Sequence, residues 1–165
     1  SDVSQEQYRQ MIQGKTASLI SCSCHIGALA GGSSDVDASK FAAFGLYLGL
    51  AFQVMDDWLG IWGNEAVTGK SAESDLVVGK KTLPVIMGLE SSTAFRAKYP
   101  GQGIDRDMAD NLARILEHDG IKDRIETETA SLTQKAIAEL SGLSINEKPM
   151  QVLIGLANQL SSRYK

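Results

Sequence analysis

The sequence predicts an all-α protein, a bundle of six or seven helices around one core, and three observations lead to this prediction. Apolar residues recur at helical spacing along most of the chain, and no segment reads as a β-strand. The 165 residues are 43% hydrophobic but only 6% aromatic, so aliphatic side chains and Ala must fill the core. A chain of this length buries roughly 68–70% of its unfolded surface, and it therefore needs no disulfide or metal to fold.

The first helix is expected to begin at Ser4. Ser4 and Gln7 form a capping-box pattern, in which the Ser4 side chain caps the helix and the Gln7 side chain reaches back. The apolar residues that follow at helical spacing are Tyr8, Met11, Ile12, Leu19, Ile26 and Leu29. Residues 31–34, Gly-Gly-Ser-Ser, end this helix, and the next one begins at Asp35 or Asp37.

The second helix contains the most apolar part of the chain, residues 41–55, where only Gln53 and the Tyr47 hydroxyl are polar. This segment is shorter than the roughly 20 residues that span a bilayer, so we expect no membrane span. A helix that is apolar on every side is expected to be buried all round, in the middle of a bundle. Gly45 and Gly49, four residues apart, would let a neighbouring helix approach closely.

Gly60 and Gly63 are expected to interrupt the second helix, and residues 63–82 form a polar stretch that we interpret as a loop; loops of this length are usually either functional or disordered. Four further helices are expected over residues 82–98, 105–118, 121–140 and from 146 to the C-terminus. Pro84 suits the first turn of the helix that starts at residue 82, because its missing N–H is not needed there.

The amino-acid composition argues against some classes of function. The net charge of −4 makes a sequence-independent nucleic-acid binder improbable, because such proteins gain affinity from excess Lys and Arg. Cys22 and Cys24 are two residues apart and face different sides of a helix, so we interpret them as small buried residues of a cytoplasmic protein. His25 lies beside them, but His118 is the only other histidine, so no metal site is predicted there. The chain has no initiator Met and no signal-peptide pattern, and we expect it to be a piece of something longer.

The adjacent carboxylates Asp56 and Asp57 form the most informative feature of the sequence. They lie in the last turns of a very apolar helix, where like charges repel and the helix dipole also disfavours negative charge. A divalent cation with carboxylate ligands, such as Mg²⁺, would compensate for this charge. Gln53 precedes the pair by about one helical turn and would share its stretch of helix surface. The alternative is a pair of solvated acids at the point where a core helix emerges into water.

The polar stretch after the pair carries lysines beside glycines. Lys70 lies in Thr68-Gly69-Lys70, and Lys80 lies in Gly79-Lys80-Lys81-Thr82-Leu83-Pro84. Lysines on such a loop suit a phosphate group that a metal ion joins to the carboxylates, because they neutralise the remaining negative charge.

Together these elements resemble the second aspartate-rich region of the trans-isoprenyl (polyprenyl) diphosphate synthases. Lys15-Thr16-Ala17 resembles the Lys-Thr element of that family, so the resemblance covers residues 15–84. It implies a helical bundle of the isoprenoid synthase type. The first aspartate-rich motif of the family is missing, so we expect residues 1–165 to be the C-terminal part of a single isoprenoid synthase domain.

The resemblance implies a prenyltransferase that condenses isopentenyl diphosphate with an allylic diphosphate, with Mg²⁺ as the cofactor. Asp56 would bind the metal directly, and Asp57 would support it. The residues implied to contact the allylic diphosphate or to line the reacting centre are Lys15, Thr16, Gln53, Lys70 and Lys80. Gly60 stands where the family usually has a third Asp, although some short-chain members similar to this one also have Gly.

The implied partners are the missing N-terminal half of the same enzyme and a second copy in a homodimer. Without the N-terminal half, the chain is expected to be inactive, because half of the magnesium site would be absent. Two alternatives remain at this stage. One is a class I terpene cyclase, which also ionises a prenyl diphosphate. The other is a non-catalytic helical partner subunit related to these synthases.

Overall fold

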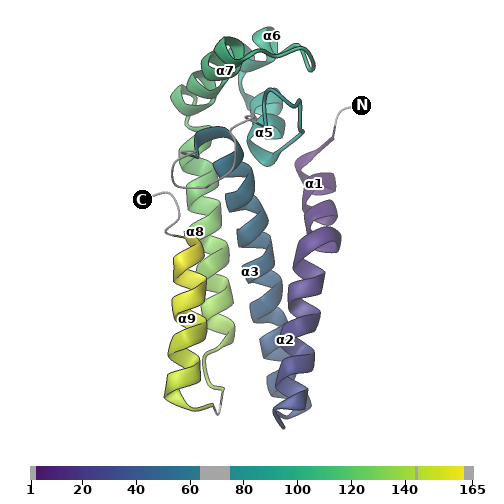
Figure 1. The fold of residues 1–165 in the computed structure, drawn as a ribbon, viewed down its shortest axis with the longest axis vertical. Helices are drawn as coiled ribbons and strands as arrows, with labels where there is room; N and C mark the ends of the chain where they lie inside the picture. The colour runs from purple at the N-terminus through teal and green to yellow at the C-terminus, as the bar shows by residue number, and fades with distance from the viewer. Residues whose placement is uncertain (1–2, 64–74, 144, 162–165) are drawn as a thin grey trace. The chain divides into compact units, whose positions relative to one another are not determined.

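The computed structural model describes residues 3–63, 75–143 and 145–161, and every regular element within these ranges is a helix. The elements in chain order are α1 (Gln5–Ile12), the π-helical turn η1 (Gln13–Ala17), α2 (Ser18–Ala30), α3 (Asp35–Trp62), α5 (Leu83–Ser91), α6 (Thr93–Lys98), α7 (Arg106–His118), α8 (Ile121–Glu139) and α9 (Glu147–Ser161) (Figure 1). The prediction of an all-α fold is confirmed.

The helices divide into two compact units, which are described separately. Unit 1 consists of Ser1–Tyr8 and Val54–Thr127, and unit 2 consists of Arg9–Gln53 and Glu128–Lys165. The long helices α3 and α8 each contribute one part to each unit.

The N-terminal helix begins as the capping box predicts. The Gln7 N–H donates to Ser4 Oγ at 3.2 Å, and the Ser4 N–H donates to Gln7 Oε1 at 3.0 Å. The prediction of one regular helix up to residue 30 is wrong in one respect, because η1 interrupts it. There the Ser18 N–H donates to the Gln13 carbonyl, five residues earlier, which is the hydrogen bond of a π-helix.

In unit 2, helix α3 contacts α2 through its glycines. A Cβ atom at Gly45 would lie 2.8 Å from the Ile20 carbonyl oxygen, and one at Gly49 would lie 2.6 Å from the Ala17 Cα. The predicted close approach of a neighbouring helix is therefore confirmed. Another side of α3 packs against α8 and α9, and the buried residues of this cluster are Phe44, Leu48, Ala136, Leu140, Leu143 and Ala157.

Helix α3 is longer than predicted, because Gly60 lies within its last turns and the helix continues to Trp62. Among the described residues it alone is long and apolar enough to cross a membrane, with a mean hydropathy of 1.3 over its best window. Residues 41–55 are all buried or partly buried, but only 50% of the window is fully buried, so the prediction of a helix buried all round is confirmed only in part. Because the core helix of a bundle can have the same length and composition, this property is weak evidence for a membrane span.

In unit 1, a serine divides the helix predicted over residues 82–98. Ser92 is the N-cap of α6, and its Oγ accepts the Phe95 N–H at 2.9 Å. A Cβ atom at Gly88 in α5 would lie 2.6 Å from a Leu116 methyl group of α7, so these helices pack closely. The α7 helix begins after Asp105 as predicted, but Met108 is 39% exposed rather than directed inward.

The cysteines of α2 are more exposed to solvent than predicted. Cys22 is exposed and Cys24 is partly exposed, and both are free thiols. No residue of α2 is fully buried, although most of its residues are apolar. The reason is that the described part of unit 2 covers the side of α2 that contacts α3, whereas Leu19 and Ile26 remain 70% and 59% exposed.

Candidate active site

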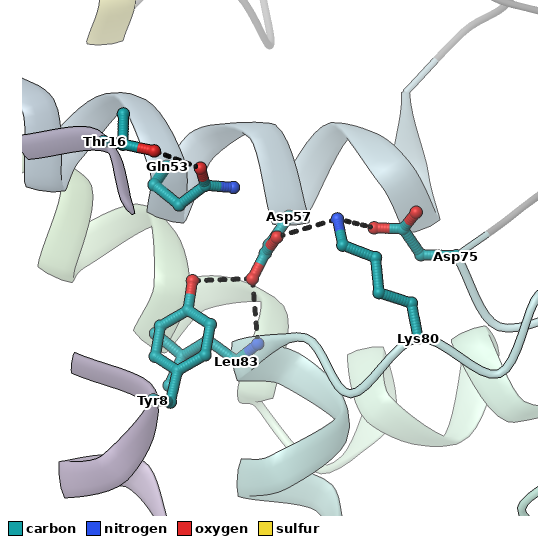
Figure 2. Close-up of polar contacts among 7 residues, drawn as sticks. All are labelled: Tyr8, Thr16, Gln53, Asp57, Asp75, Lys80 and Leu83. Carbon is teal, nitrogen blue, oxygen red and sulfur yellow. Dashed lines mark hydrogen bonds and ion pairs between the residues drawn. The ribbon is translucent and has the colours of Figure 1, made fainter. Parts of the chain in front are cut away.

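Asp57 is the centre of a hydrogen-bond network near the end of α3, in unit 1. The residue is 1% exposed, and its carboxylate accepts the Tyr8 hydroxyl at 2.6 Å and the Leu83 N–H at 3.1 Å (Figure 2). Lys80 Nζ donates to its other oxygen at 3.2 Å. These three donors, one of them positively charged, offset both the burial of the carboxylate and its unfavourable place near the C-terminal end of a helix.

The same carboxylate caps the next helix in the chain. Thr82 occupies the N-cap position of α5, but its side chain accepts no N–H of the helix, and its buried Oγ1 has no hydrogen-bond partner among the described residues. Asp57 instead accepts the N–H of Leu83, the first residue of α5. A negative charge at a helix N-terminus is favourable, so Asp57 links the end of α3 to the start of α5.

Asp56 differs from its neighbour in exposure. It is partly exposed, whereas Asp57 is buried. Of the two residues, Asp56 is therefore the one in contact with solvent. This difference fits the predicted division of roles, in which Asp56 binds a metal ion and Asp57 supports it.

Lys80 lies between two carboxylates. Besides its bond to Asp57, its Nζ donates to Asp75 Oδ2 at 2.9 Å, and its side chain is 42% exposed. Burial disfavours the charge of this lysine, but the hydrogen bond to Asp75 and the two negative charges outweigh it and raise the pKa of Lys80. Burial raises the pKa of Asp75, although the bond to Lys80 acts against this shift.

Asp75 and Tyr8 belong to this network although the sequence does not predict them as site residues. Asp75 lies in the stretch interpreted as a phosphate-binding loop, where only the lysines were considered. A partial signal was available, because a carboxylate five residues before Lys80 is a natural partner for its charge. Tyr8 lies 49 residues from Asp57 in the chain, and nothing in the local pattern connects the two.

A second pair of predicted residues meets in unit 2. Thr16 Oγ1 donates to Gln53 Oε1 at 3.0 Å, so the hydroxyl of η1 is tied to α3 (Figure 2). Gln53 is 9% exposed, and Lys15, next to Thr16 in η1, is exposed. The π-helical turn therefore carries both residues of the predicted Lys-Thr element, and π-helical turns are frequent at functional sites.

The structure thus brings Asp57 to Lys80 and Thr16 to Gln53. Because these pairs lie in different units, each pair is described only within its own unit. Lys70 lies outside the described residues. No role proposed for these side chains is tested by the geometry alone, so each stays a prediction.

The donor set fits a divalent cation only in part. Among the described residues, no group of three or more His, Cys, Asp or Glu side chains is assembled to hold a metal ion. Mg²⁺ is commonly bound by one or two carboxylates together with substrate phosphates and water. Asp56 could supply such a carboxylate, and the other ligands would have to come from substrate and from residues beyond this set.

Comparison with known proteins identifies the family. The sequence matches the polyprenyl synthetase family over residues 1–118, which is most of the chain. The chain belongs to this family. The match includes η1, α3 and the Asp57 network, so the site lies within the part of the chain that is characteristic of polyprenyl synthetases.

Two curated polyprenyl synthetases illustrate the relationship. The chain is 46% identical to the geranylgeranyl diphosphate synthase of Mycobacterium tuberculosis over 102 residues, which are 59% of this chain and 29% of that protein. It is 38% identical to heptaprenyl diphosphate synthase component 2 of Geobacillus stearothermophilus over 143 residues, 85% of this chain and 44% of the relative. The chain thus spans less than half the length of these relatives.

A solved polyprenyl synthase confirms the fold. The crystal structure of the enzyme from Caulobacter crescentus CB15, in complex with calcium and isoprenyl diphosphate, superposes with a TM-score of 0.89 at 28% identity. The superposition covers 99% of this chain and 51% of the Caulobacter chain. The predicted fold, a partial helical bundle of the polyprenyl synthase type, is therefore correct.

Proposed function

We propose that this chain is the C-terminal half of a prenyltransferase that condenses isopentenyl diphosphate with an allylic diphosphate. One observation carries the proposal. In a chain of the polyprenyl synthetase family, Asp57 is held by Tyr8, Lys80 and Leu83, and the adjacent Asp56 is partly exposed near the end of the same helix. Such a fixed carboxylate pair suits a site for a metal-bound diphosphate.

The reaction would break the allylic carbon–oxygen bond, and the electron pair of that bond would leave with diphosphate. The double bond of isopentenyl diphosphate would then attack the allylic carbon, and a proton would be lost to the departed diphosphate. Mg²⁺, when bound at Asp56, would stabilise the charge of the leaving diphosphate. Lys15, Lys70 and Lys80 would neutralise the rest of that charge.

Thr16 and Gln53 would line the reacting centre. The Thr16 hydroxyl donates its hydrogen to Gln53, so towards other groups it presents oxygen lone pairs rather than its proton. A hydroxyl held in this state can help to receive the proton that is lost after coupling. This polarity supports the role proposed for Thr16.

The apolar side of α1 and α2 supports the proposal of a partner that completes the domain. Met11, Leu19, Ile26 and Leu29 are between 41% and 70% exposed, and they follow one another at helical spacing. Contiguous apolar surface of this kind marks an interaction site. Since the relatives are more than twice as long as their match to this chain, we propose that the N-terminal half of the enzyme covers this side.

A homodimer and a cytoplasmic location belong to the same proposal. The homodimer rests on the family resemblance. The location is supported by the thiols of Cys22 and Cys24, which are free and at least partly exposed, because such thiols persist in a reducing compartment.

The test is co-expression of this chain with the N-terminal half of heptaprenyl diphosphate synthase component 2. The assay supplies isopentenyl and allylic diphosphates with and without Mg²⁺. We expect elongation only when both halves and Mg²⁺ are present, and we expect Asp56→Ala to abolish it. The chain alone should be inactive.

The alternatives give different outcomes. A cyclic hydrocarbon formed from the allylic diphosphate alone would indicate a terpene cyclase. Absence of both turnover and Mg²⁺-dependent bisphosphonate binding in the restored complex would indicate a non-catalytic subunit. Robust turnover by the chain alone would contradict the proposed dependence on a second half.

A further inference from the structure

Asp75 is held against the end of α3 by its backbone. Its N–H donates to the Gly60 carbonyl at 2.8 Å, and this carbonyl lies in the last turn of α3, where helical carbonyls lack intrahelical partners. The Asp75 carbonyl in turn accepts the Lys80 N–H at 2.9 Å, which closes the turn between the two residues. Leu76, the next residue, is 0% exposed and anchors this turn in the core.

The Asp75 side chain occupies the space beside Gly60. A Cβ atom built on Gly60 would lie 2.3 Å from Asp75 Oδ2 and 2.5 Å from its Cγ. Real atoms do not approach so closely, so any side chain at position 60 would push the carboxylate away from α3. The Asp75 side chain is only 19% exposed in this place.

From this place Asp75 holds the head group of Lys80. The Lys80 ammonium is 2.9 Å from Asp75 and 3.2 Å from Asp57, so it is fixed between two carboxylates that come from different segments (Figure 2). A lysine has a flexible four-carbon side chain, and one weak surface contact does not fix its position. The second carboxylate limits where the ammonium can lie.

We propose that Asp75 is a positioning residue for Lys80, and that Gly60 is needed because the absence of a side chain admits the Asp75 carboxylate. The functional consequence rests on the proposed function, in which Lys80 binds the diphosphate of the allylic substrate. A lysine that is already oriented loses less conformational entropy when the diphosphate binds.

The geometric test is a double-mutant cycle on the chain itself, with Gly60→Ala, Asp75→Ala and the double variant. The readout is the acetylation rate of Lys80, measured by peptide mass spectrometry against the exposed neighbour Lys81. We expect each single substitution to speed acetylation of Lys80 about two- to fivefold. We expect the double variant to equal the single variants, because both act on the same contact.

Two further variants keep the test informative. Gly27→Ala is the matched control for helix propensity, since a Cβ atom at Gly27 in α2 meets nothing within 4 Å. It should leave the acetylation rate of Lys80 unchanged. Asp75→Asn keeps the shape and an acceptor oxygen, so it should give a smaller increase than Asp75→Ala. Additive effects of Gly60→Ala and Asp75→Ala, or an unchanged rate in both, would overturn the inference.

The functional test uses the complex of both halves and measures KM for the allylic diphosphate and the dissociation constant of magnesium pyrophosphate. Gly60→Ala and Asp75→Ala should weaken binding of both ligands by the same factor, with no further loss in the double variant. If the acetylation cycle behaves as expected but pyrophosphate does not bind, the proposed function fails and the positioning of Lys80 stands. If binding is retained in all variants of an active complex, Asp75 has no positioning role.

Discussion

Asp56 and Asp57 are adjacent in sequence, but their carboxylates have different surroundings. Removing Asp57 takes away the acceptor for Tyr8 and the Leu83 N–H, which it binds in a buried setting, and for Lys80, whose side chain is 42% exposed. We expect Asp57→Ala to lower the free energy of unfolding by about 2–4 kcal/mol, measured by chemical denaturation. Asp57→Asn should cost less, because the amide oxygen still accepts one or two of these donors.

Asp56→Ala is the matched control for this prediction. Asp56 is partly exposed, so its removal should lower the free energy of unfolding by less than the removal of the buried Asp57 does. Equal losses of stability in Asp56→Ala and Asp57→Ala would contradict the division into a structural and an accessible carboxylate.

Asp75 should make stability depend on pH in a specific direction. Burial raises its pKa above the ordinary value of 3.8, so the folded chain binds this proton more tightly than the unfolded chain. The resulting contribution to stability is present below pH 3.8 and is lost as the pH rises through the folded-state pKa. Asp75→Asn removes this titration, so its stability relative to the unmodified chain should increase as the pH rises across this window.

The measurement is the free energy of unfolding of both proteins from acid to neutral pH. Parallel curves would show that folding leaves the Asp75 pKa unchanged. A decrease in the relative stability of Asp75→Asn with rising pH would show that the pKa is lowered instead.

For individual residues, the sequence predicts which side chains carry chemical function better than it predicts their hydrogen-bond partners. Asp57 and Lys80 were identified because carboxylates and lysines in that order are typical of diphosphate sites. The partners Tyr8 and Asp75 were not identified, because their roles depend on where the chain returns in space. The prediction of buried cysteines failed for a related reason, since burial depends on what covers the other side of α2.

At the level of elements, the contact between α2 and α3 depends on glycine. A Cβ atom at Gly49 would lie 2.6 Å from the Ala17 backbone, which cannot move as a side chain can. We expect Gly49→Ala to destabilise the chain by about 1–3 kcal/mol, because the helices must separate. Gly27→Ala, in open space, should instead stabilise it by about 0.5–1 kcal/mol through helix propensity. Stabilisation by both substitutions would contradict the close contact.

The break between α5 and α6 gives a second prediction for an element. Ser92 Oγ accepts the Phe95 N–H and donates to Asp119, so it caps α6 and connects it to the end of α7. Ser92→Ala should cost about 1 kcal/mol in chemical denaturation. Thr93→Ala, one residue later and exposed, is the control and should have little effect.

The sequence does not predict this break, because residues 89–98 contain neither Gly nor Pro to mark it. Helix α5 buries six consecutive residues, Leu83–Gly88, whereas α6 buries Phe95. The N-cap at Ser92, which separates the two helices, depends on local hydrogen bonds. The start of α5 at Pro84 and the capping box at Ser4 were predicted correctly, because there a side-chain signal coincides with a change in pattern.

For the whole molecule, the exposed apolar side of α1 and α2 indicates which substitutions should weaken association with the N-terminal half. Leu19 is 70% exposed, so Leu19→Lys should change the stability of the chain itself by less than about 0.5 kcal/mol. It should nevertheless weaken association with the N-terminal half, measured by co-purification and by activity of the complex. Val152→Lys, at a 66% exposed position on α9, is the matched control. Equal effects of both substitutions would contradict a role for α2 in assembly.

The π-helical turn η1 accommodates one more residue than a regular α-helical turn would. Ile12 and Ala17 are five residues apart, yet they are 2% and 0% exposed. In an α-helix, residues five apart point in directions that differ by about 140°, whereas the wider turn of a π-helix brings them nearly into line. The turn therefore acts as a one-residue insertion whose extra position faces outward. Deletion of Gly14 should restore a regular helix with the same buried side, while Lys15 and Thr16 would lose their present directions.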